Sequence, residues 1–479
     1  MNNLQPTDVF RFFSEINKVP RPSGKSDKIN AYLISFANER DLEYDIDEVG
    51  NVIIRKPASP GMEEHPGVIL QSHTDMVCEK INNLNFDFET QPIETFVDGD
   101  WLKAKGTTLG ADDGIGMALS LAILNDKKLK HGPIECLFTT DEEVGLDGAF
   151  GIQQGFMKGK YLINLDSEDE GEIYVGCAGG QNTTAVFDYT VEPVPQNYFT
   201  MRINIDGLCG GHSGDDIVKR RANANKLLAR FLYSSMKKYD IRIIEISGGN
   251  LHNAIPRYAT ALIALPSTNK EDIRVDFNIF SADVEDEFHT TEKNLNFTMV
   301  SEQTVSPSID VTTAHRIIMS LQAVHNGVYE MSQDIEGMPE TSSNIASIKM
   351  AEGKLTIISS QRSMTLSSRI NEQHAIEAAF LLAGAKVTTN GGYPGWKPKM
   401  DSKLLKVTCD TYYQLYGKEP LVKVIHAGLE CGLFTEKYPH LELISVGPTM
   451  RGVHSPDERL LIPTVDLVWK LIIKTIENL

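Results

Sequence analysis

Histidine and acidic residues follow apolar, strand-like runs at several points along the chain. The run Val68–Ser72 leads directly into His73 and Asp75, in the order His-x-Asp. Residues two apart on a strand face the same side, about 6.5 Å from each other. Asp75 can therefore fix the tautomer of His73, as a metal-binding histidine requires. A capping aspartate beside an ordinary buried histidine would explain the same pair.

Two acidic motifs come later in the chain. The motif Gly110-Ala111-Asp112-Asp113-Gly114 opens a predicted helix, and Asp141-Glu142-Glu143 follows the apolar run Ile134–Thr139. Helix capping or a solvated turn would account for each motif alone. Ligands of open α/β sheets, however, bind at the carboxyl edge of the strands. Adjacent acids there point in different directions, so one could bind a metal while its neighbour addresses a water molecule.

The same pattern recurs at Asp166, after Tyr161–Leu165, and at His454, in a loop after the predicted strand Leu443–Val446. Together these positions suit a two-metal site, in which two ions ~3.5–4 Å apart share a bridging carboxylate. Zinc accepts both histidine nitrogen and carboxylate oxygen. Five residues supply enough ligand atoms for two metal ions if Asp112 bridges them: His73, Asp112, Glu143, Asp166 and His454.

Composition narrows the class of protein. The 479 residues include 46 Lys and Arg against 65 Asp and Glu, a net charge of −19. This acidity argues against nucleic acid or an anionic membrane as the main partner, and no apolar run reaches the ~18 residues of a membrane helix. The N-terminus has no secretory signal pattern. The 6 cysteines form no Cys-x-x-Cys pair, which favours free thiols and a cytoplasmic location.

The order of predicted elements indicates an α/β domain built from both ends of the chain. Helices are expected over 7–18, 26–40 and 112–124, between strands dense in Val, Ile and Leu that suit a mostly parallel sheet. Turn-rich stretches near 178–180 and 390–399 mark the seams. The predicted domains are therefore 1–180 and 393–479 for the α/β domain, with 181–392 inserted.

The inserted segment has the pattern of an α+β domain with an internal duplication. A strand at 199–205 is followed by a glycine-rich loop at 207–214, a helix over 215–233 and a hairpin of 241–247 with 259–265. A similar order recurs from a strand at 296–300, because Phe297-Thr298-Met299 matches Phe199-Thr200-Met201. The recurring elements are a helix over 311–325 and strands over 346–350 and 355–360.

The motifs together resemble the di-zinc exopeptidases related to carboxypeptidase G, peptidase T and carnosinase, along the whole chain. The matching stretches are SHTDMVCEK, TTLGADDGIG, DEEVGLDGA, INLDSEDEGE, GGHSGDDI, LHNAIPR and GPTMRGVHSPDERL. The resemblance implies a catalytic α/β domain interrupted by a lid domain. It also implies two zinc ions, with manganese or cobalt as substitutes, and hydrolysis of small dipeptides, with Xaa-His dipeptides first and broader tolerance.

The resemblance also assigns roles at the metal site. It implies that His73 and Asp166 hold one zinc and that Glu143 and His454 hold the other, with Asp112 bridging. Asp75 would orient His73. Glu142 would be the general base and then the acid that protonates the leaving amine. A cis peptide bond is expected between Asp112 and Asp113.

In the lid, the resemblance implies that His212 stabilises the oxyanion of the reaction. Asn253, Arg369 and Gly428 are the implied substrate-binding residues. Arg369 would grip the terminal carboxylate, since a guanidinium fork suits a carboxylate. A surface charge on an edge strand would explain Arg369 equally well.

Two other functions stay open at this point. A tripeptidase, a carboxypeptidase or an N-acyl-amino-acid amidohydrolase would use the same chemistry, and a catalytically silent binding protein could keep the same fold. The intact Glu142 and the full ligand set argue against the silent protein. Both a monomer and a homodimer are compatible with the sequence.

Overall fold

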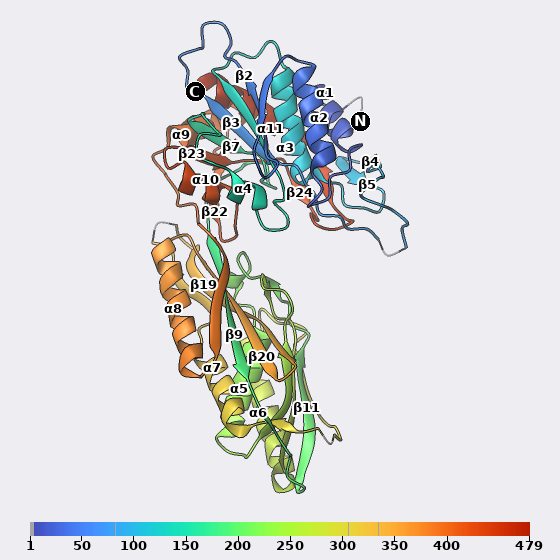
Figure 1. Cartoon of the computed structure of the whole chain (residues 1–479), viewed down its shortest axis with the longest axis vertical. Helices are drawn as coiled ribbons and strands as arrows, with labels where there is room; N and C mark the ends of the chain where they lie inside the picture. Colours follow the sequence, from blue (N-terminus) through green and yellow to red (C-terminus); the bar gives the residue numbers. More distant parts are fainter. Residues whose placement is uncertain (1–3, 82, 305, 334) are drawn as a thin grey trace. The chain divides into compact units, whose positions relative to one another are not determined.

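The computed structural model describes residues 4–81, 83–304, 306–333 and 335–479. The chain forms two compact units (Figure 1). The first unit comprises Met1–Cys177, Trp396–Val424 and Leu429–Leu479, and the second comprises Ala178–Gly395 and Ile425–Gly428. The main boundaries lie close to the predicted seams at 180 and 392, but the segment Ile425–Gly428 belongs to the second unit rather than to the C-terminal part of the first.

An eight-stranded sheet forms the centre of the first unit. Its order is β1 (Glu43–Ile46), β2 (Val52–Lys56), β6 (Ile134–Thr139), β3 (Val68–His73), β7 (Tyr161–Asn164), β23 (Glu442–Ser445), β8 (Glu172–Cys177) and β22 (Leu421–Ile425). The four strands from β6 to β23 are parallel to one another. This confirms the α/β class, with parallel pairing at the centre of the sheet.

The central strands are apolar because helices cover them. Every residue of β3 and β6 is buried, as expected for parallel strands. Helix α3 packs on β3, and α1 packs on α3. The helices of this unit are α1 (Thr7–Ile16), α2 (Asp27–Asn38), α3 (Ala111–Asn125), α4 (Asp147–Gly151), α9 (Lys403–Tyr416), α10 (Cys431–Lys437) and α11 (Ile462–Asn478).

A small four-stranded sheet accompanies the main one in the first unit. Its order is β24 (Met450–Arg451), β25 (Arg459–Leu461), β5 (Trp101–Ala104) and β4 (Thr95–Asp98). The loop between β24 and β25 carries His454, so pairing of β25 with β5 fixes the base of that loop.

The second unit is a large antiparallel sheet with helices. The main strand order is β16 (Asn296–Ser301), β11 (Tyr198–Asp206), β15 (Ala259–Pro266), β13 (Arg242–Gly248), β19 (Pro339–Ala351), β20 (Lys354–Ser363), β9 (Gly179–Asp188) and β21 (Lys386–Tyr393), with β18 (Gly327–Met331) paired to β19. Its helices are α5 (Ala224–Met236), α6 (Lys270–Glu287), α7 (Val311–Ala323) and α8 (Leu366–Leu382).

The sheet of this unit does not set the predicted second repeat apart. Read outward from the β13–β19 junction, the strands are β13, β15, β11 and β16 on one side and β19, β20, β9 and β21 on the other. Strand β16, predicted to begin the second repeat, pairs with β11, with Phe297 facing Ile205, and does not neighbour β19 or β20. The likeness of residues 199–201 and 297–299 misled the assignment, because both strands present similar apolar residues.

The predicted helix over 215–233 is also wrong in its first half. The structure has a short 3-10 turn at Ile217–Lys219, and α5 begins only at Ala224. Arg220 has a φ of 53°, which breaks the helical path. Asn223 then caps α5 by accepting a hydrogen bond from the N–H of Lys226. The cap, rather than the apolar periodicity, sets where this helix starts.

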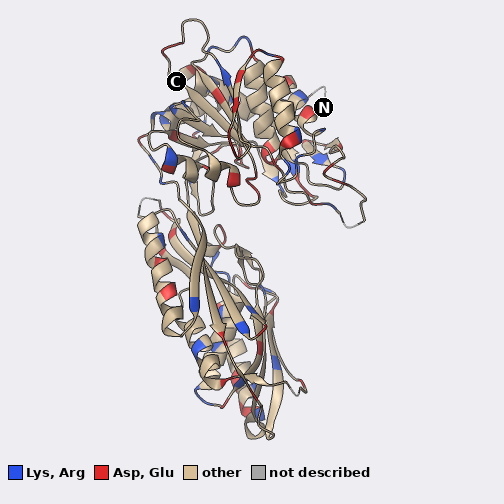
Figure 2. Cartoon of the chain, in the orientation of Figure 1, with Lys and Arg blue, Asp and Glu red and all other residues tan. Residues whose placement is uncertain are grey.

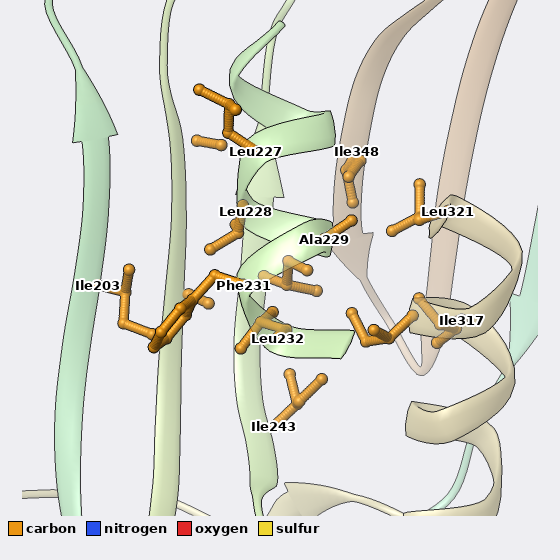
Figure 3. Close-up of a cluster of buried hydrophobic side chains, with 14 of the residues drawn as sticks. Ile203, Leu227, Leu228, Ala229, Phe231, Leu232, Ile243, Ile317, Leu321 and Ile348 are labelled. Atoms are coloured by element: carbon orange, nitrogen blue, oxygen red, sulfur yellow. The ribbon is translucent and has the colours of Figure 1, made fainter. Parts of the chain in front are cut away.

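The core of the second unit lies between the sheet and its helices. Leu228 and Leu232 of α5 face the strands, and Ile317 and Leu321 of α7 lie beside them (Figure 3). Acidic and basic residues are spread over helices and strands of both units (Figure 2). Within the described ranges, no helix combines the length and apolar character that crossing a membrane requires. The six cysteines are free thiols, and Cys209 alone is exposed.

Candidate metal centre and second-unit cluster

The carboxyl ends of the central strands gather the predicted metal ligands at one edge of the sheet. His73 is the last residue of β3, Glu143 lies shortly after β6, and Asp166 follows β7. Since these strands are parallel neighbours in the order β6, β3, β7, their carboxyl ends meet at one edge. Asp112 enters from the start of α3 and His454 from the β24–β25 loop.

Asp112 lies at the middle of this group, and its two oxygens face different partners. Oδ1 is 2.9 Å from Nε2 of His73, which lies 3.6 Å from Oδ1 of Asp166. Oδ2 is 3.2 Å from Nε2 of His454, which lies 3.0 Å from Oε2 of Glu143. One carboxylate thus separates two histidine–acid pairs, which is the arrangement of a bridging ligand.

The electrostatics of the group call for a cation. Burial and the neighbouring Asp112 carboxylate raise the pKa of Asp166 well above its usual range. Oε1 of Glu143 is buried and has no hydrogen-bond partner among the described residues. Ligand atoms of His73, Asp112 and Glu143 lie within 4.8 Å of one another. Imidazole nitrogen and carboxylate oxygen together suit zinc, manganese or cobalt, so the residues present fit the implied metal.

The adjacent aspartates of the α3 start point to different places. The peptide bond between Asp112 and Asp113 is cis, as expected. The carboxylate of Asp113 is fully buried and accepts a hydrogen bond from the N–H of Gly116 at 3.1 Å. The structure therefore brings Asp112, rather than Asp113, to the two histidines.

Asp75 connects the histidine strand to the acidic turn. Its Oδ1 makes a long contact of 3.4 Å with Nδ1 of His73. The same carboxylate accepts hydrogen bonds from the N–H groups of Glu142 at 3.0 Å and Glu143 at 3.3 Å, and from Ser23 Oγ at 2.6 Å. Asp75 therefore lies against His73 and fixes the backbone that carries both glutamates.

Glu142 is next to Glu143 in the chain but is not among the residues whose ligand atoms lie within 4.8 Å of one another. Burial and the nearby carboxylates of Glu430 and Glu143 raise the pKa of Glu142 well above its usual value. A carboxylate in such surroundings exchanges protons nearer to neutral pH than an exposed one.

A buried polar network that includes Glu430 lies under this edge. Oε2 of Glu430 accepts hydrogen bonds from Nε2 of Gln71 at 2.6 Å and from Oγ1 of Thr139 at 2.9 Å. Oε1 of Gln71 accepts one from Nδ2 of Asn164 at 2.6 Å, and Oδ1 of Asn164 accepts one from the N–H of Asp166 at 3.3 Å. The network ties the ends of β3, β6 and β7 together beneath the ligands.

The predicted lid histidine belongs to a polar cluster of the second unit. His212 lies on the short strand β12 (Gly211–His212), which pairs with β14 (Ala254–Ile255). Its Nδ1 accepts a hydrogen bond from the N–H of Asp215 at 3.3 Å. Asn253 is exposed next to this ribbon, and its carbonyl accepts a hydrogen bond from the N–H of Ser213 at 2.8 Å. The structure thus brings His212 and Asn253 to the same ribbon.

Arg362, which the sequence reasoning missed, lies beside His212. Nη2 of Arg362 is 3.5 Å from Nε2 of His212, and its Nη1 donates to Oη of Tyr393 at 2.9 Å. The predicted Arg369 instead donates from Nη1 to the carbonyl of Gly180 at 2.9 Å and to that of Tyr393. The available signal was the polar end of an otherwise apolar strand, Gln361-Arg362-Ser363.

Gly428 and His426 complete this cluster. A Cβ on Gly428 would lie 2.6 Å from the ring of Tyr393, so glycine lets the tyrosine that holds Arg362 approach. Nε2 of His426 lies 2.8 Å from Oγ of Ser342. Burial and the Arg362 charge lower the pKa of His426 to about 3, so this imidazole is neutral at physiological pH.

Comparisons with known proteins place the chain among peptidases. A family model described as peptidase family M20/M25/M40 matches residues 69–478. The chain is 40% identical over 479 residues to the cytosol non-specific dipeptidase of Escherichia coli strain K12, covering 100% of this chain and 99% of that protein.

Solved structures give the same picture. The aminoacylhistidine dipeptidase from Vibrio alginolyticus superposes with a TM-score of 0.91 and 43% identity, covering 99% of this chain and 97% of that one. Human carnosine dipeptidase 1 superposes with a TM-score of 0.52 and 11% identity, covering 98% and 95%. This second likeness concerns the fold alone.

Proposed function

Because this chain belongs to the peptidase family M20/M25/M40 and is a metallopeptidase, we propose that it is a dipeptidase with two zinc ions. The position of the Asp112 carboxylate between two histidine–acid pairs carries the proposal. His73 and Asp166 would hold one ion, and Glu143 and His454 the other, with Asp112 shared between them. Manganese or cobalt could replace zinc, since the ligand atoms suit all three.

A bound zinc pair supplies positive charge that lowers the pKa of a water molecule and polarises a carbonyl. We assign the proton transfers to Glu142, which accepts the proton of the attacking water and passes it to the leaving nitrogen. Asp75 supports this role because it fixes the backbone of Glu142 and Glu143. From adjacent positions, Glu142 can then transfer protons while Glu143 binds a metal ion.

The second-unit cluster supports roles in substrate binding. We assign oxyanion stabilisation to His212, whose ring is held by the N–H of Asp215. We assign binding of the substrate's terminal carboxylate to Arg362 in preference to Arg369. The Arg369 guanidinium already donates hydrogen bonds to two backbone carbonyls. Arg362 and His212 together offer cationic and donor groups to one anion. Asn253 and Gly428 remain proposed substrate-binding residues.

The proposed substrates are dipeptides with histidine at the second position, together with other dipeptides. The broader tolerance is supported by 40% identity to a non-specific dipeptidase, and the histidine preference by 43% identity to an aminoacylhistidine dipeptidase. The name of the Escherichia coli relative also supports a cytosolic location for this chain.

Hydrolysis assays on zinc-loaded protein test the proposal. We expect cleavage of β-alanyl-histidine and alanyl-histidine, slower cleavage of alanyl-leucine, and little cleavage of a tripeptide or an N-acetyl amino acid. Preference for the tripeptide or the N-acetyl compound would replace the dipeptidase assignment by the corresponding activity. No turnover of any of these compounds by zinc-loaded protein would contradict the enzymatic function.

A further inference from the structure

We propose that Glu458 and Arg21 are positioning residues that hold Asp112 between its two partner pairs. Both are buried, each with only 2% exposure, and both bind the backbone of the segment that leads into Asp112. The inference rests on the proposed function, because it takes Asp112 to be the shared metal ligand.

Glu458 binds consecutive backbone N–H groups at the start of α3. Oε2 accepts hydrogen bonds from Leu109 at 2.7 Å and Gly110 at 2.9 Å. Oε1 accepts from Ala111 at 2.7 Å and makes a longer contact with the N–H of Asp112 at 3.4 Å. A carboxylate offers enough lone pairs for all of them. Asp112 and Asp113 have non-helical backbone angles, so these N–H groups belong to the turn that leads into the regular helix, and a buried carboxylate supplies the acceptors that they need.

The carboxylate that binds this segment comes from far along the chain. Gly110 has no side chain to offer, and Asp112 and Asp113 are not helical, so the regular helix begins after Asp113, which itself accepts a hydrogen bond from the N–H of Gly116. Glu458 reaches the segment from the β24–β25 loop, four residues after His454, where its N–H donates to the carbonyl of Ser455 at 3.0 Å. Glu458 therefore connects the loop of one predicted ligand to the backbone of the shared one.

Arg21 makes the complementary connection from the other side. Its Nη1 donates to the carbonyls of Thr74 at 3.0 Å and Asp75 at 2.6 Å, directly after His73. Its Nη2 donates to the carbonyl of Gly110. The N–H of Gly110 thus binds Glu458 while its carbonyl binds Arg21, so opposite charges hold the two sides of one residue.

Two glycines of the motif Gly110-Ala111-Asp112-Asp113-Gly114 make room for this arrangement. A Cβ on Gly110 or on Gly114 would lie 2.6 Å from Nη2 of Arg21. Gly110 also has a φ of +66°, which other residues rarely adopt. The spacing of this motif therefore serves the guanidinium of Arg21 as well as the carboxylate of Asp112.

The two residues should affect different halves of the metal centre. Arg21 joins the Asp112 segment to the loop of His73, and Glu458 joins it to the loop of His454. Loss of the Glu458 carboxylate should therefore lower mainly the affinity for the ion that Asp112 and His454 would hold. Substitution of Arg21 should lower mainly the affinity for the ion that Asp112 and His73 would hold.

The test is zinc affinity, measured by competition with a chromophoric chelator, in Glu458→Gln and a matched control. The control is Glu135→Gln, because Glu135 is also buried and accepts backbone N–H bonds from Lys158 and Gly159, both at 2.8 Å. It lies near the start of β6, at the opposite end of that strand from the acidic turn. We expect Glu458→Gln to lower the affinity for at least one zinc ion about 10- to 100-fold, as loss of a residue that supports a metal ligand typically does. Glu135→Gln should keep wild-type affinity.

Thermal unfolding of metal-free and zinc-loaded protein separates positioning from general stability. Both glutamine variants should lower the melting temperature of the metal-free protein, but only Glu458→Gln should reduce the rise caused by zinc. Equal zinc affinity in wild type and Glu458→Gln would overturn the role of Glu458. If Glu458→Gln does not fold, Arg21→Lys decides, since one ammonium reaches fewer carbonyls than a guanidinium. If Arg21→Lys then binds zinc as tightly as the wild type, the positioning proposal is overturned. If the wild type itself binds no zinc, the proposed function is contradicted.

Discussion

The guanidinium of Arg362 lies beside the imidazole of His212, with Nη2 3.5 Å from Nε2. Tyr393 holds the other side of the guanidinium through its hydroxyl at 2.9 Å. Arg362 is nine-tenths buried, and its planar guanidinium presents several N–H donors. A buried cation next to a histidine is a good partner for an anionic group, and a substrate carboxylate is such a group.

Arg362→Met should therefore raise KM for dipeptides sharply, by about 10- to 100-fold, the usual worth of a hydrogen bond to a charged group. Steady-state kinetics with a dipeptide and its C-terminal amide measure this. Amidation should harm the wild type strongly and Arg362→Met only slightly.

Arg369→Met provides the comparison, because its guanidinium binds carbonyls of Gly180 and Tyr393. We expect this variant to lose stability while keeping the wild-type sensitivity to amidation. Insensitivity to amidation in Arg369→Met alone would restore Arg369 as the carboxylate-binding residue.

His212→Ala should lower kcat by ~10²–10³, the typical cost of losing one oxyanion donor. Zinc content should stay at the wild-type level, because His212 is not among the predicted ligands. Elemental analysis and kinetics on the same preparation check both expectations. An unchanged kcat would make His212 an ordinary residue of the β12–β14 ribbon.

The adjacent glutamates should respond differently to the same substitution. Glu142→Gln should keep both zinc ions and lower kcat by ~10²–10⁴, since it removes the proton acceptor. Glu143→Gln should weaken zinc binding, and added zinc should partly restore activity. Titration of zinc against activity in both variants measures this, and loss of zinc from Glu142→Gln alone would reverse the two roles.

Acid should destabilise the second unit partly through His426. Burial lowers the pKa of His426 to about 3 in the folded chain, while the unfolded chain titrates near 6.5. Between these values the unfolded state binds more protons, so the unfolding free energy falls with decreasing pH, by at most ~1.4 kcal/mol per pH unit. The contribution is fully present above pH about 6.5.

His426→Gln should remove that dependence because glutamine does not titrate. Thermal unfolding at several pH values between 4.5 and 7.5 compares the two proteins. The difference in melting temperature between wild type and variant should shrink or reverse as pH falls. A constant difference over this range would show that His426 is protonated at no cost in the folded chain.

Local sequence was sufficient to predict which histidine and acidic side chains gather at the carboxyl ends of β3, β6 and β7. Parallel strands deliver their carboxyl ends to one edge, so a histidine or acid just after an apolar run is informative by itself. The same holds for the start of α3, where glycines bracket two acids. Elements with a strong apolar period, such as α1 and α3, also lie within a few residues of the predicted positions.

Long-range contacts account for what the sequence could not provide. Glu458 accepts a hydrogen bond from the N–H of Ala111, 347 positions earlier in the chain, and no local pattern predicts such a partner. Arg362 was passed over for Arg369 because only the fold shows which guanidinium is already bound to carbonyls. The pairing of β16 with β11 likewise depends on the sheet, since both strands carry similar residues.

The metal content of the purified chain and of Asp112→Ala tests the central claim most directly. If Asp112 is shared by two ions, the wild type should contain two zinc ions per chain by elemental analysis after loading and desalting. Asp112→Ala should then lose both, whereas His454→Ala should retain one, because His73, Asp112 and Asp166 remain. One zinc ion per chain in fully active wild type, or two retained in Asp112→Ala, would contradict the account.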